Sequence, residues 1–278
     1  NGSSLLSLVG SSTKSVTLTL GTDVTLKNNK SSGVNVNTYA KLIITSGSEI
    51  SGNTGQGGIY SSGSVEIEGG KVSGNGGAGI YNYGGTLTVT GGEISGNTGS
   101  SGYGIYNDKG TVTVTGGEVS GNKSNGIYNY AQNGNASLTV SGGKISGNGG
   151  SGIYNYGGSS YTAETVLEGD LEIRGHVITA SNGGGVYNRT YSDSSKYADQ
   201  AKVTVKGSVR ITGNTATGSS TFCYGGGVYN TGTLEIGENA QISGNTAENT
   251  GSYSADGGGI YNEGWGKVTV DGNAKLNG

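Results

Sequence analysis

One short segment gathers acidic, basic and imidazole side chains. It lies within 164–176 and contains Glu164, Glu168, Asp170, Glu172, Arg174 and His176. A close pair of carboxylates can perform glycoside hydrolysis, and a carboxylate cluster that holds calcium beside a basic residue can support polysaccharide lysis. His176 has no Ser or Cys partner with which to form a nucleophile system. The segment defines an alternative function, a carbohydrate-active enzyme, but no residue in it is assigned as catalytic.

A row of tyrosines recurs in one frame, Gly-Ile-Tyr-Asn or Gly-Val-Tyr-Asn. Neighbouring side chains of a strand point to opposite faces, so an inward Ile or Val leaves each Tyr facing outward. Such a strip either stacks on itself and stabilises the sheet or forms a platform for sugar rings or a partner protein. The candidate ligand-binding residues are six tyrosines of this frame and three from loops: Tyr81, Tyr106, Tyr128, Tyr154, Tyr187, Tyr229, Tyr191, Tyr197 and Tyr224.

The frame is the anchor of an internal repeat. Its spacing varies from 21 residues, between Ile59 and Ile80, to 42 residues, between Val186 and Val228. Each repeat also contains an alternating pair such as Leu87-x-Val89 and a third apolar residue such as Ile94. Period-two alternation separated by Gly-Gly and Gly-Asn predicts strands and turns, and no helical periodicity is visible. The sequence therefore predicts an all-β, right-handed, single-stranded parallel β-helix with three short strands per turn and about nine turns.

The repeat predicts a single domain over residues 1–278. Residues 1–13 are expected to cap the N-terminal end of the core, and the chain is expected to stop in mid-turn as part of a longer protein. Four insertions, 156–165, 189–201, 215–226 and 246–258, are expected to cluster beside the rod. Loops on a rigid scaffold often carry binding residues.

Stacked repeats turn other positions into columns. Two sets of asparagines, which include Asn97 and Asn82, are expected to turn corners with positive φ while their amides bond the amides above and below. Rows of Thr such as Thr86, Thr88 and Thr90 resemble an ice-binding face, a further alternative. In the turn that departs most from the repeat, 176–182 is expected to replace the Glu-Ile-Ser-Gly-Asn strand.

Composition limits the partners. The chain contains 60 Gly and no Pro, lacks a Gly-X-Y period and has a net charge of −3, which argues against collagen and nucleic-acid binding. No apolar run is long enough to insert into a membrane. No zinc spacing, phosphate loop or calcium repeat is present, so neither a cofactor nor a metal is expected. The partner is expected to be a glycan or a surface protein of a host or microbe.

The motifs Gly-Gly-Gly-Ile-Tyr-Asn at 257–262 and Ile-Ser-Gly-Asn-Thr at 242–246 resemble repeats of large bacterial cell-surface proteins. They are similar to the Gly-Gly-Ala-Ile repeats of chlamydial polymorphic outer membrane proteins and to adhesin-like proteins of gut bacteria. The resemblance covers about 33–278 and implies a right-handed parallel β-helix. It also implies an extracellular or cell-surface location and an adhesin or stalk function. The same solenoid carries lyases and glycoside hydrolases, so it does not by itself specify an activity.

Overall fold

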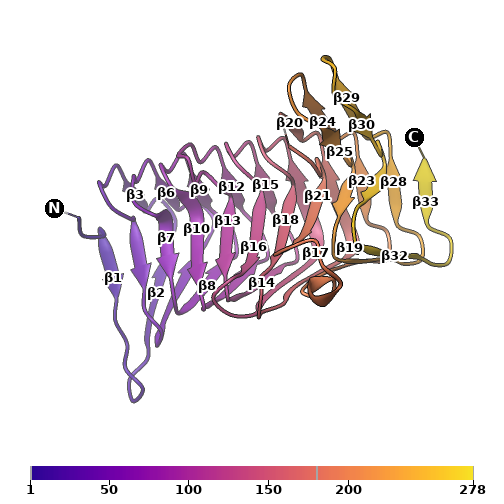
Figure 1. The fold of residues 1–278 in the computed structure, drawn as a ribbon. Coiled ribbons are helices and arrows are strands. Elements are labelled where there is room, and N and C mark those ends of the chain that lie inside the picture. Colours follow the sequence, from indigo (N-terminus) through magenta and orange to yellow (C-terminus); the bar gives the residue numbers. More distant parts are fainter. Residues whose placement is uncertain (1, 180, 278) are drawn as a thin grey trace.

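The protein is a rod of stacked coils, with the two termini at opposite ends (Figure 1). The structure is a computed structural model that describes residues 2–179 and 181–277. Each coil contributes three short strands, which pair in parallel with their counterparts in the adjacent coils, for example β10 with β7 and β11 with β8. The hydrogen bonds between coils therefore run along the rod, as in a parallel β-helix.

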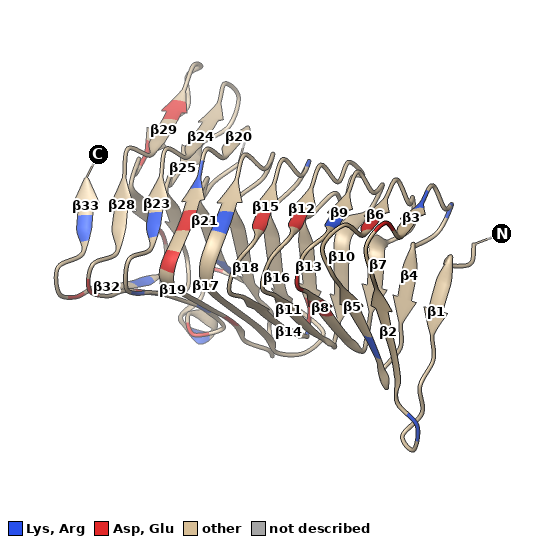
Figure 2. Ribbon diagram, turned by 180° about the vertical axis from the view of Figure 1, so that it is seen from behind, with Lys and Arg blue, Asp and Glu red and all other residues tan. Residues whose placement is uncertain are grey.

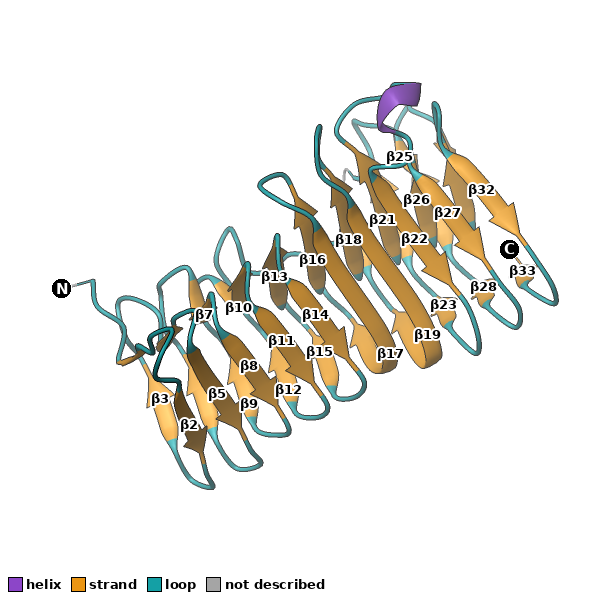
Figure 3. Ribbon diagram, turned by 90° about the horizontal axis from the view of Figure 1, so that it is seen from below, coloured by secondary structure: helices purple, strands orange, loops and turns teal. Residues whose placement is uncertain are grey.

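The strands form three columns, and in two coils a long strand continues through a corner (Figure 3). The first column is a ten-stranded sheet, here called the first sheet: β1 (Leu6–Leu8), β4 (Val34–Val36), β7 (Gly57–Ser61), β10 (Ala78–Tyr83), β13 (Ile105–Asp108), β16 (Ile127–Ala131), β18 (Ile153–Gly157), β21 (Val186–Thr190), β26 (Val228–Asn230) and β31 (Ile260–Asn262). The second column contains β2 (Val16–Leu20), β5 (Ala40–Ile44), β8 (Ser64–Ile67), β11 (Thr86–Val89), β14 (Thr111–Val114), β22 (Ala201–Val205), β27 (Thr233–Ile236) and β32 (Lys267–Val270). The third contains β3 (Thr25–Lys27), β6 (Glu49–Ser51), β9 (Lys71–Ser73), β12 (Glu93–Ser95), β15 (Glu118–Ser120), β23 (Arg210–Thr212), β28 (Gln241–Ser243) and β33 (Lys275–Asn277). β17 (Ala136–Ser146) and β19 (Ala163–Arg174) belong to both the second and the third column.

This architecture confirms the expected fold, with three strands per coil. The first sheet has ten strands, one more than the expected nine turns, because Leu6–Leu8 pairs with Val34–Val36. A strand of the first coil thus lies within residues 1–13, the segment expected to be a cap. Among the described residues, no helix has the length and apolar character needed to cross a bilayer.

The core is a line of aliphatic side chains that runs the length of the rod. Ile59, Ile80 and Ile105 of the first sheet are fully buried, as are Leu42 and Leu138 of the second column. Burial alternates along each strand, so that in β16 the Ile is buried and the following Tyr is half-buried. The period-two pattern of the sequence is therefore the pattern of inward and outward side chains.

Two asparagine ladders lie inside the rod. In the first ladder, each amide spans two adjacent coils: Asn122 Nδ2 donates to Asn148 Oδ1 at 2.8 Å, and Asn97 Nδ2 donates to Asn122 Oδ1 at 2.7 Å. The members of this ladder are Asn53, Asn75, Asn97, Asn122, Asn148, Asn214 and Asn245. The second ladder joins Asn82, Asn107, Asn129, Asn155, Asn188, Asn230 and Asn262 with amide bonds of 2.7–2.9 Å. The predicted amide stacking is confirmed.

The predicted positive φ at these asparagines is wrong, because glycine takes that conformation instead. Gly96 and Gly121, which precede Asn97 and Asn122, have φ near 60°. A second glycine makes room for each ladder amide: a Cβ built at Gly104 would lie 2.8 Å from Asn122 Nδ2. In the frame Gly-Ile-Tyr-Asn, Gly therefore accommodates the first ladder, Ile fills the core and Asn joins the second ladder.

The insertions lie at the two opposite ends of the strands of the first sheet, rather than in a single cluster. The segments 156–165 and 189–201 follow β18 and β21, and the second of these contains the helical turn η1 (Ser195–Tyr197). The segments 215–226 and 246–258 precede β26 and β31. They form β24 (Thr215–Gly218), β25 (Cys223–Tyr224), β29 (Thr246–Asn249) and β30 (Ala255–Asp256), which project from the rod together with β20 (Val177–Thr179) (Figure 1). In the C-terminal half, insertions therefore flank both the N-terminal and the C-terminal ends of the strands of the first sheet.

The second ladder has an acceptor that a substitution can satisfy. Asn82 Oδ1 is buried and accepts no hydrogen bond from the described residues, because its register partner in the preceding coil is Ser61. We expect Ser61→Asn to supply this donor and to raise the free energy of unfolding by about 1 kcal/mol, the net contribution of one hydrogen bond. Urea denaturation compared with Ser61→Ala, which adds no donor, tests this. An unchanged or lower midpoint for Ser61→Asn would contradict it.

Candidate functional site

The tyrosine strip lies on the outer face of the first sheet. It contains one ring from each of eight successive coils: Tyr60, Tyr81, Tyr106, Tyr128, Tyr154, Tyr187, Tyr229 and Tyr261. The parallel register puts equivalent tyrosines directly opposite each other, for example Tyr81 and Tyr106. The fixed Gly-Ile-Tyr-Asn spacing produces this alignment, since Ile and Asn face inward on the same strand.

Most rings of the strip stack face to face. Tyr154 and Tyr187 have centroids 4.6 Å apart and ring planes 4° apart, and Tyr128 and Tyr154 are separated by 4.7 Å and 18°. The faces of these rings are therefore covered by their neighbours. A sugar ring stacks on an exposed aromatic face, so this part of the strip cannot serve as the flat platform considered from the sequence.

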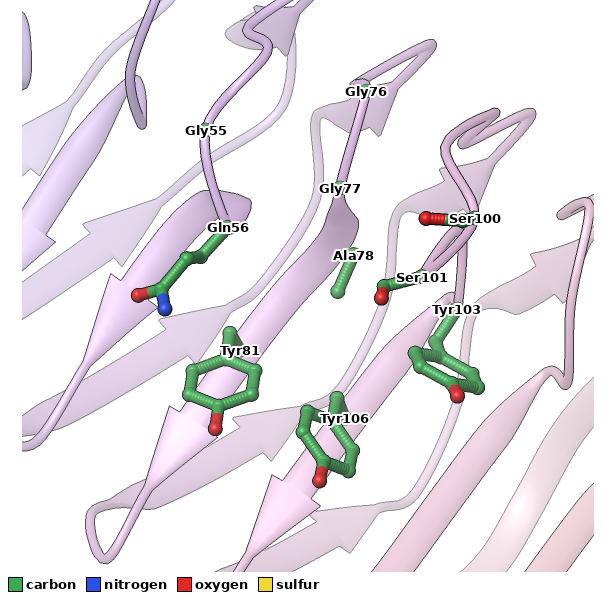
Figure 4. A pocket seen from close by; sticks show the side chains of 10 residues that line it. All are labelled: Gly55, Gln56, Gly76, Gly77, Ala78, Tyr81, Ser100, Ser101, Tyr103 and Tyr106. Atoms are coloured by element: carbon green, nitrogen blue, oxygen red, sulfur yellow. The ribbon is translucent and has the colours of Figure 1, made fainter. Parts of the chain in front are cut away.

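The stacking is broken most strongly at two places, and a pocket lies at each. Tyr106 is tilted by 48° from Tyr81, and Tyr229 by 82° from Tyr187. The first pocket has a volume of about 450 Å³ (Figure 4). Its walls are Tyr81 and Tyr106 on adjacent strands and Tyr103 on the loop before β13, and its remaining lining is Gly55, Gln56, Gly76, Gly77, Ala78, Ser100 and Ser101.

Glycine forms much of the lining because neighbouring coils approach closely there. A Cβ at Gly77 would lie 2.3 Å from the carbonyl oxygens of Gly55 and Gln56, so no side chain fits without a backbone shift. The absence of side chains at these positions leaves space beside the Tyr81 and Tyr106 rings. Sequence analysis identified Tyr81 and Tyr106 but missed Tyr103, which lies in a connecting segment outside the repeated frame.

A second tyrosine row borders the strip. It is formed by Tyr83, Tyr130 and Tyr156, two residues after the strip tyrosines of their coils, and the same row contains Asp108 and Arg189. Asp108 is 3% exposed and accepts hydrogen bonds from Tyr81 Oη at 3.4 Å and Asn133 Nδ2 at 3.2 Å. The repeated Tyr-Asn-Tyr spacing is the sequence signal for this row.

Burial raises the pKa of the phenols of the strip above the ordinary value. It is the main cause that raises the pKa of Tyr81, with the Asp108 carboxylate as the next cause. Burial also raises the pKa of Tyr106, and that of Tyr154 to about 12. For Tyr229, burial and a hydrogen bond to the Glu263 carboxylate both raise the pKa. At neutral pH these hydroxyls are therefore uncharged groups that can donate and accept hydrogen bonds.

The second pocket has a volume of about 230 Å³ and lies near the C-terminal end of the strip. It is lined by Tyr187, Arg189, Thr190, Tyr191, Ser192, Asp193, Tyr229, Thr231 and Glu263. Of the loop tyrosines in the candidate set, Tyr191 lines this pocket and Tyr197 packs edge to face against Tyr191 at 5.5 Å. Tyr224 lies in the insertion that precedes β26, and its ring stacks on Tyr261 at 4.2 Å. The structure thus divides the nine candidate tyrosines among the two pockets, the stacked strip and the loops.

The 164–176 region does not form the site considered for an enzyme. His176 is fully buried inside the rod, whereas Glu172 and Arg174 pair with each other at 2.9 Å on the outside. Glu168 pairs with Lys206 and Asp170 with Arg210. The proposed replacement of the third strand by 176–182 is also wrong, because Glu172, Ile173 and Arg174 pair with Lys144, Ile145 and Ser146.

His176 occupies the position of an asparagine in the first ladder. Its Nδ1 accepts from the Asn148 backbone N–H at 3.1 Å, and its Nε2 lies 3.1 Å from the Ile145 carbonyl oxygen, to which it donates. Both ring nitrogens are therefore used within the rod by a neutral imidazole. Burial, the main cause, lowers the pKa of His176 to about 4. This histidine is structural and does not face solvent.

Two further columns, one of charged residues and one of threonines, lie on the outside of the rod. A column of charged residues, Glu49, Lys71, Glu93, Glu118 and Lys144, follows the third strands (Figure 2), and within it Lys71 pairs with Glu93 at 3.3 Å and Lys144 with Glu118 at 3.2 Å. Such exposed pairs contribute little to stability. Thr88, Thr113 and Thr139 are in register, but Glu66 precedes this row and Val166 follows it. The described residues contain no group of three or more His, Cys, Asp or Glu side chains placed to hold a metal ion.

Comparison with curated proteins and with solved structures found no match. A family model described as "Right handed beta helix region" matches residues 7–167, which are 161 of the 278 residues. The matched part contains the N-terminal coils, the first pocket and the beginning of β19. With its coiled parallel strands and this match over more than half its length, the chain belongs to the right-handed β-helix family.

Proposed function

We propose that this β-helix is a non-catalytic, surface-exposed adhesin that binds a glycan through its tyrosine strip. The observation that carries the proposal is the first pocket, where Tyr106 is tilted by 48° from Tyr81 and both rings border a glycine-lined surface. Tyrosine hydroxyls, Gln56 and the serines of this pocket offer the hydrogen bonds that sugar hydroxyls require. Its volume of about 450 Å³ is within the usual range of small-molecule sites, roughly 300–1,000 Å³.

The rod itself suits a scaffold for recognition at a surface. The stacked coils hold Tyr81 and Tyr106 on strands that are backed by a buried amide ladder, so these two rings do not have to become ordered when a ligand binds. We place the protein outside the cell or on its surface. The matched family supports the fold, and the adhesin function rests on the geometry of the pocket.

The test is a glycan array followed by calorimetry with the double variant Tyr81→Ala/Tyr106→Ala. We expect the dissociation constant of an array-selected glycan to rise about tenfold or more, because aromatic contacts contribute on the order of 1 kcal/mol each. Tyr161→Ala is the matched control, since Tyr161 is 41% exposed in a loop away from the strip. Circular dichroism establishes that each variant keeps its fold. Unchanged affinity in the folded double variant would overturn the assignment of this pocket, and product release from the glycan would overturn the non-catalytic assignment.

A further inference from the structure

The second pocket differs from the first in its charged lining. Arg189, Asp193 and Glu263 reach it from the ends of β21 and β31 and from the 189–201 insertion. Arg189 Nη1 donates to Tyr154 Oη at 3.2 Å, and Glu263 accepts from the Tyr229 hydroxyl. Within residues 2–179 and 181–277, no ion pair joins Arg189 to either carboxylate. Among the described residues, the pocket therefore contains charges of both signs that form no ion pair with each other.

Hydrogen bonds between coils hold the walls in place. Asp193 Oδ1 accepts from the Trp265 backbone N–H at 3.2 Å, which ties the insertion to the last coil. At the base, Thr190 and Thr231 are joined by their hydroxyls at 3.2 Å. Residues from three successive coils thus converge on one point. The pocket is preorganised, which reduces the ordering that a ligand would otherwise impose.

We propose that the second pocket binds a single non-acidic sugar ring, a deduction that rests on the proposed glycan binding. The volume of about 230 Å³ is below the range of drug-sized pockets, which favours one ring over an oligosaccharide. The two carboxylates accept hydrogen bonds from hydroxyl or amino groups of the ring, and each retains acceptor sites beyond its internal partner. Tyr191, which is 48% exposed, contributes an aromatic wall.

The charge balance determines which sugars fit. Two carboxylates and one guanidinium line the pocket, and that guanidinium donates a hydrogen bond to Tyr154. An acidic sugar would bring a third carboxylate into this pocket, and like charges at close range are unfavourable. An apolar ligand would cover the remaining donor and acceptor sites of Arg189, Asp193 and Glu263 without forming hydrogen bonds to them. A neutral or amino-bearing pyranose satisfies them.

The experiment titrates the full chain with methyl glycosides of a neutral hexose, a hexosamine and a uronic acid, and with lysine methyl ester. We expect the hexose or the hexosamine to bind and the uronic acid to bind at least about tenfold more weakly. Glu263→Gln and Asp193→Asn should each weaken binding about tenfold, because a neutral amide oxygen accepts a weaker hydrogen bond than a carboxylate does. The matched control is Asp199→Asn on the same insertion, where Asp199 bonds Lys267 and Thr233 outside the pocket.

The outcomes separate this inference from the proposed function. Sugar binding that survives both pocket variants but is lost in Tyr81→Ala/Tyr106→Ala overturns the second pocket alone. Loss in the pocket variants, with no effect of the tyrosine changes, supports the second pocket and overturns the first. Preference for the uronic acid, or binding of the lysine ester without any sugar, overturns the inference. Asp193 and Glu263 lie on different segments of the chain, so if one variant misfolds, the other still tests the inference.

Discussion

Asn122→Ala is expected to lower the free energy of unfolding by about 3–5 kcal/mol, because it leaves several buried polar groups without partners. Asn122 Oδ1 accepts from both the backbone N–H and the side-chain Nδ2 of Asn97, and Asn122 Nδ2 donates to the Ile94 carbonyl oxygen. All of these groups lie where water cannot replace the lost amide. Each unsatisfied group costs roughly 1–3 kcal/mol, so the total is large for one small side chain.

Urea denaturation followed by circular dichroism measures this effect. Asn273→Ala is the control, because Asn273 is exposed near the C-terminal end and its truncation should change stability by no more than about 0.5 kcal/mol. If the two variants lost similar amounts of stability, the first ladder would not contribute the interior hydrogen bonding described here.

Acidification is expected to destabilise the wild-type protein through His176. The folded pKa is about 4 and the ordinary value is 6.5, so between these values the unfolded state takes up a proton that the folded state does not. The contribution of His176 to the free energy of unfolding therefore falls as the pH falls from about 6.5 to about 4 and changes no further below that. A difference of this size corresponds to roughly 3 kcal/mol in total.

His176→Asn is the matched variant for this test. Its amide can donate to the Ile145 carbonyl and accept from the Asn148 N–H, as the asparagines of the other coils do, but it does not titrate. Denaturation midpoints measured at several values of pH between 7 and 4 should show a steeper decline for the wild type than for the variant. Effects of other groups, such as Asp108, whose pKa burial raises, are present in both proteins and cancel. Parallel pH profiles would contradict the assignment.

The repeat predicted the fold and the side-chain directions because one short frame imposes both. Within Gly-Ile-Tyr-Asn, alternation determines that Ile80 is inward and Tyr81 outward, and equal frames must stack in register. The same reasoning predicted the amide contacts between ladder asparagines. It could not predict which residue takes the positive φ, since Gly96 and Asn97 are adjacent and both tolerate that conformation.

The candidate site was harder to predict, because it depends on ring orientation and on insertions. Sequence spacing gives one Tyr per coil, but the 48° tilt at Tyr106 results from local packing that includes Tyr103 on a loop. The misassignment of His176 has a different cause. The segment Leu171-x-Ile173 has the alternating pattern of a second-column strand. However, Thr165 and Leu167 occupy that column, because the register shifts within β19. Only the paired strands of the adjacent coil reveal the shift.

The lengthwise direction of the hydrogen bonds has a mechanical consequence. Backbone bonds of the strand columns cross the boundaries between coils, amide bonds of the two ladders cross many of the same boundaries, and all of these bonds run along the rod axis. A tensile load spread over a whole coil is shared among these bonds, so they resist together and rupture together. A load applied to one end of the polypeptide reaches only the outermost coil, which peels away before the next is stressed. The force that the rod withstands therefore depends on whether the load is applied to a whole coil or to one end of the polypeptide.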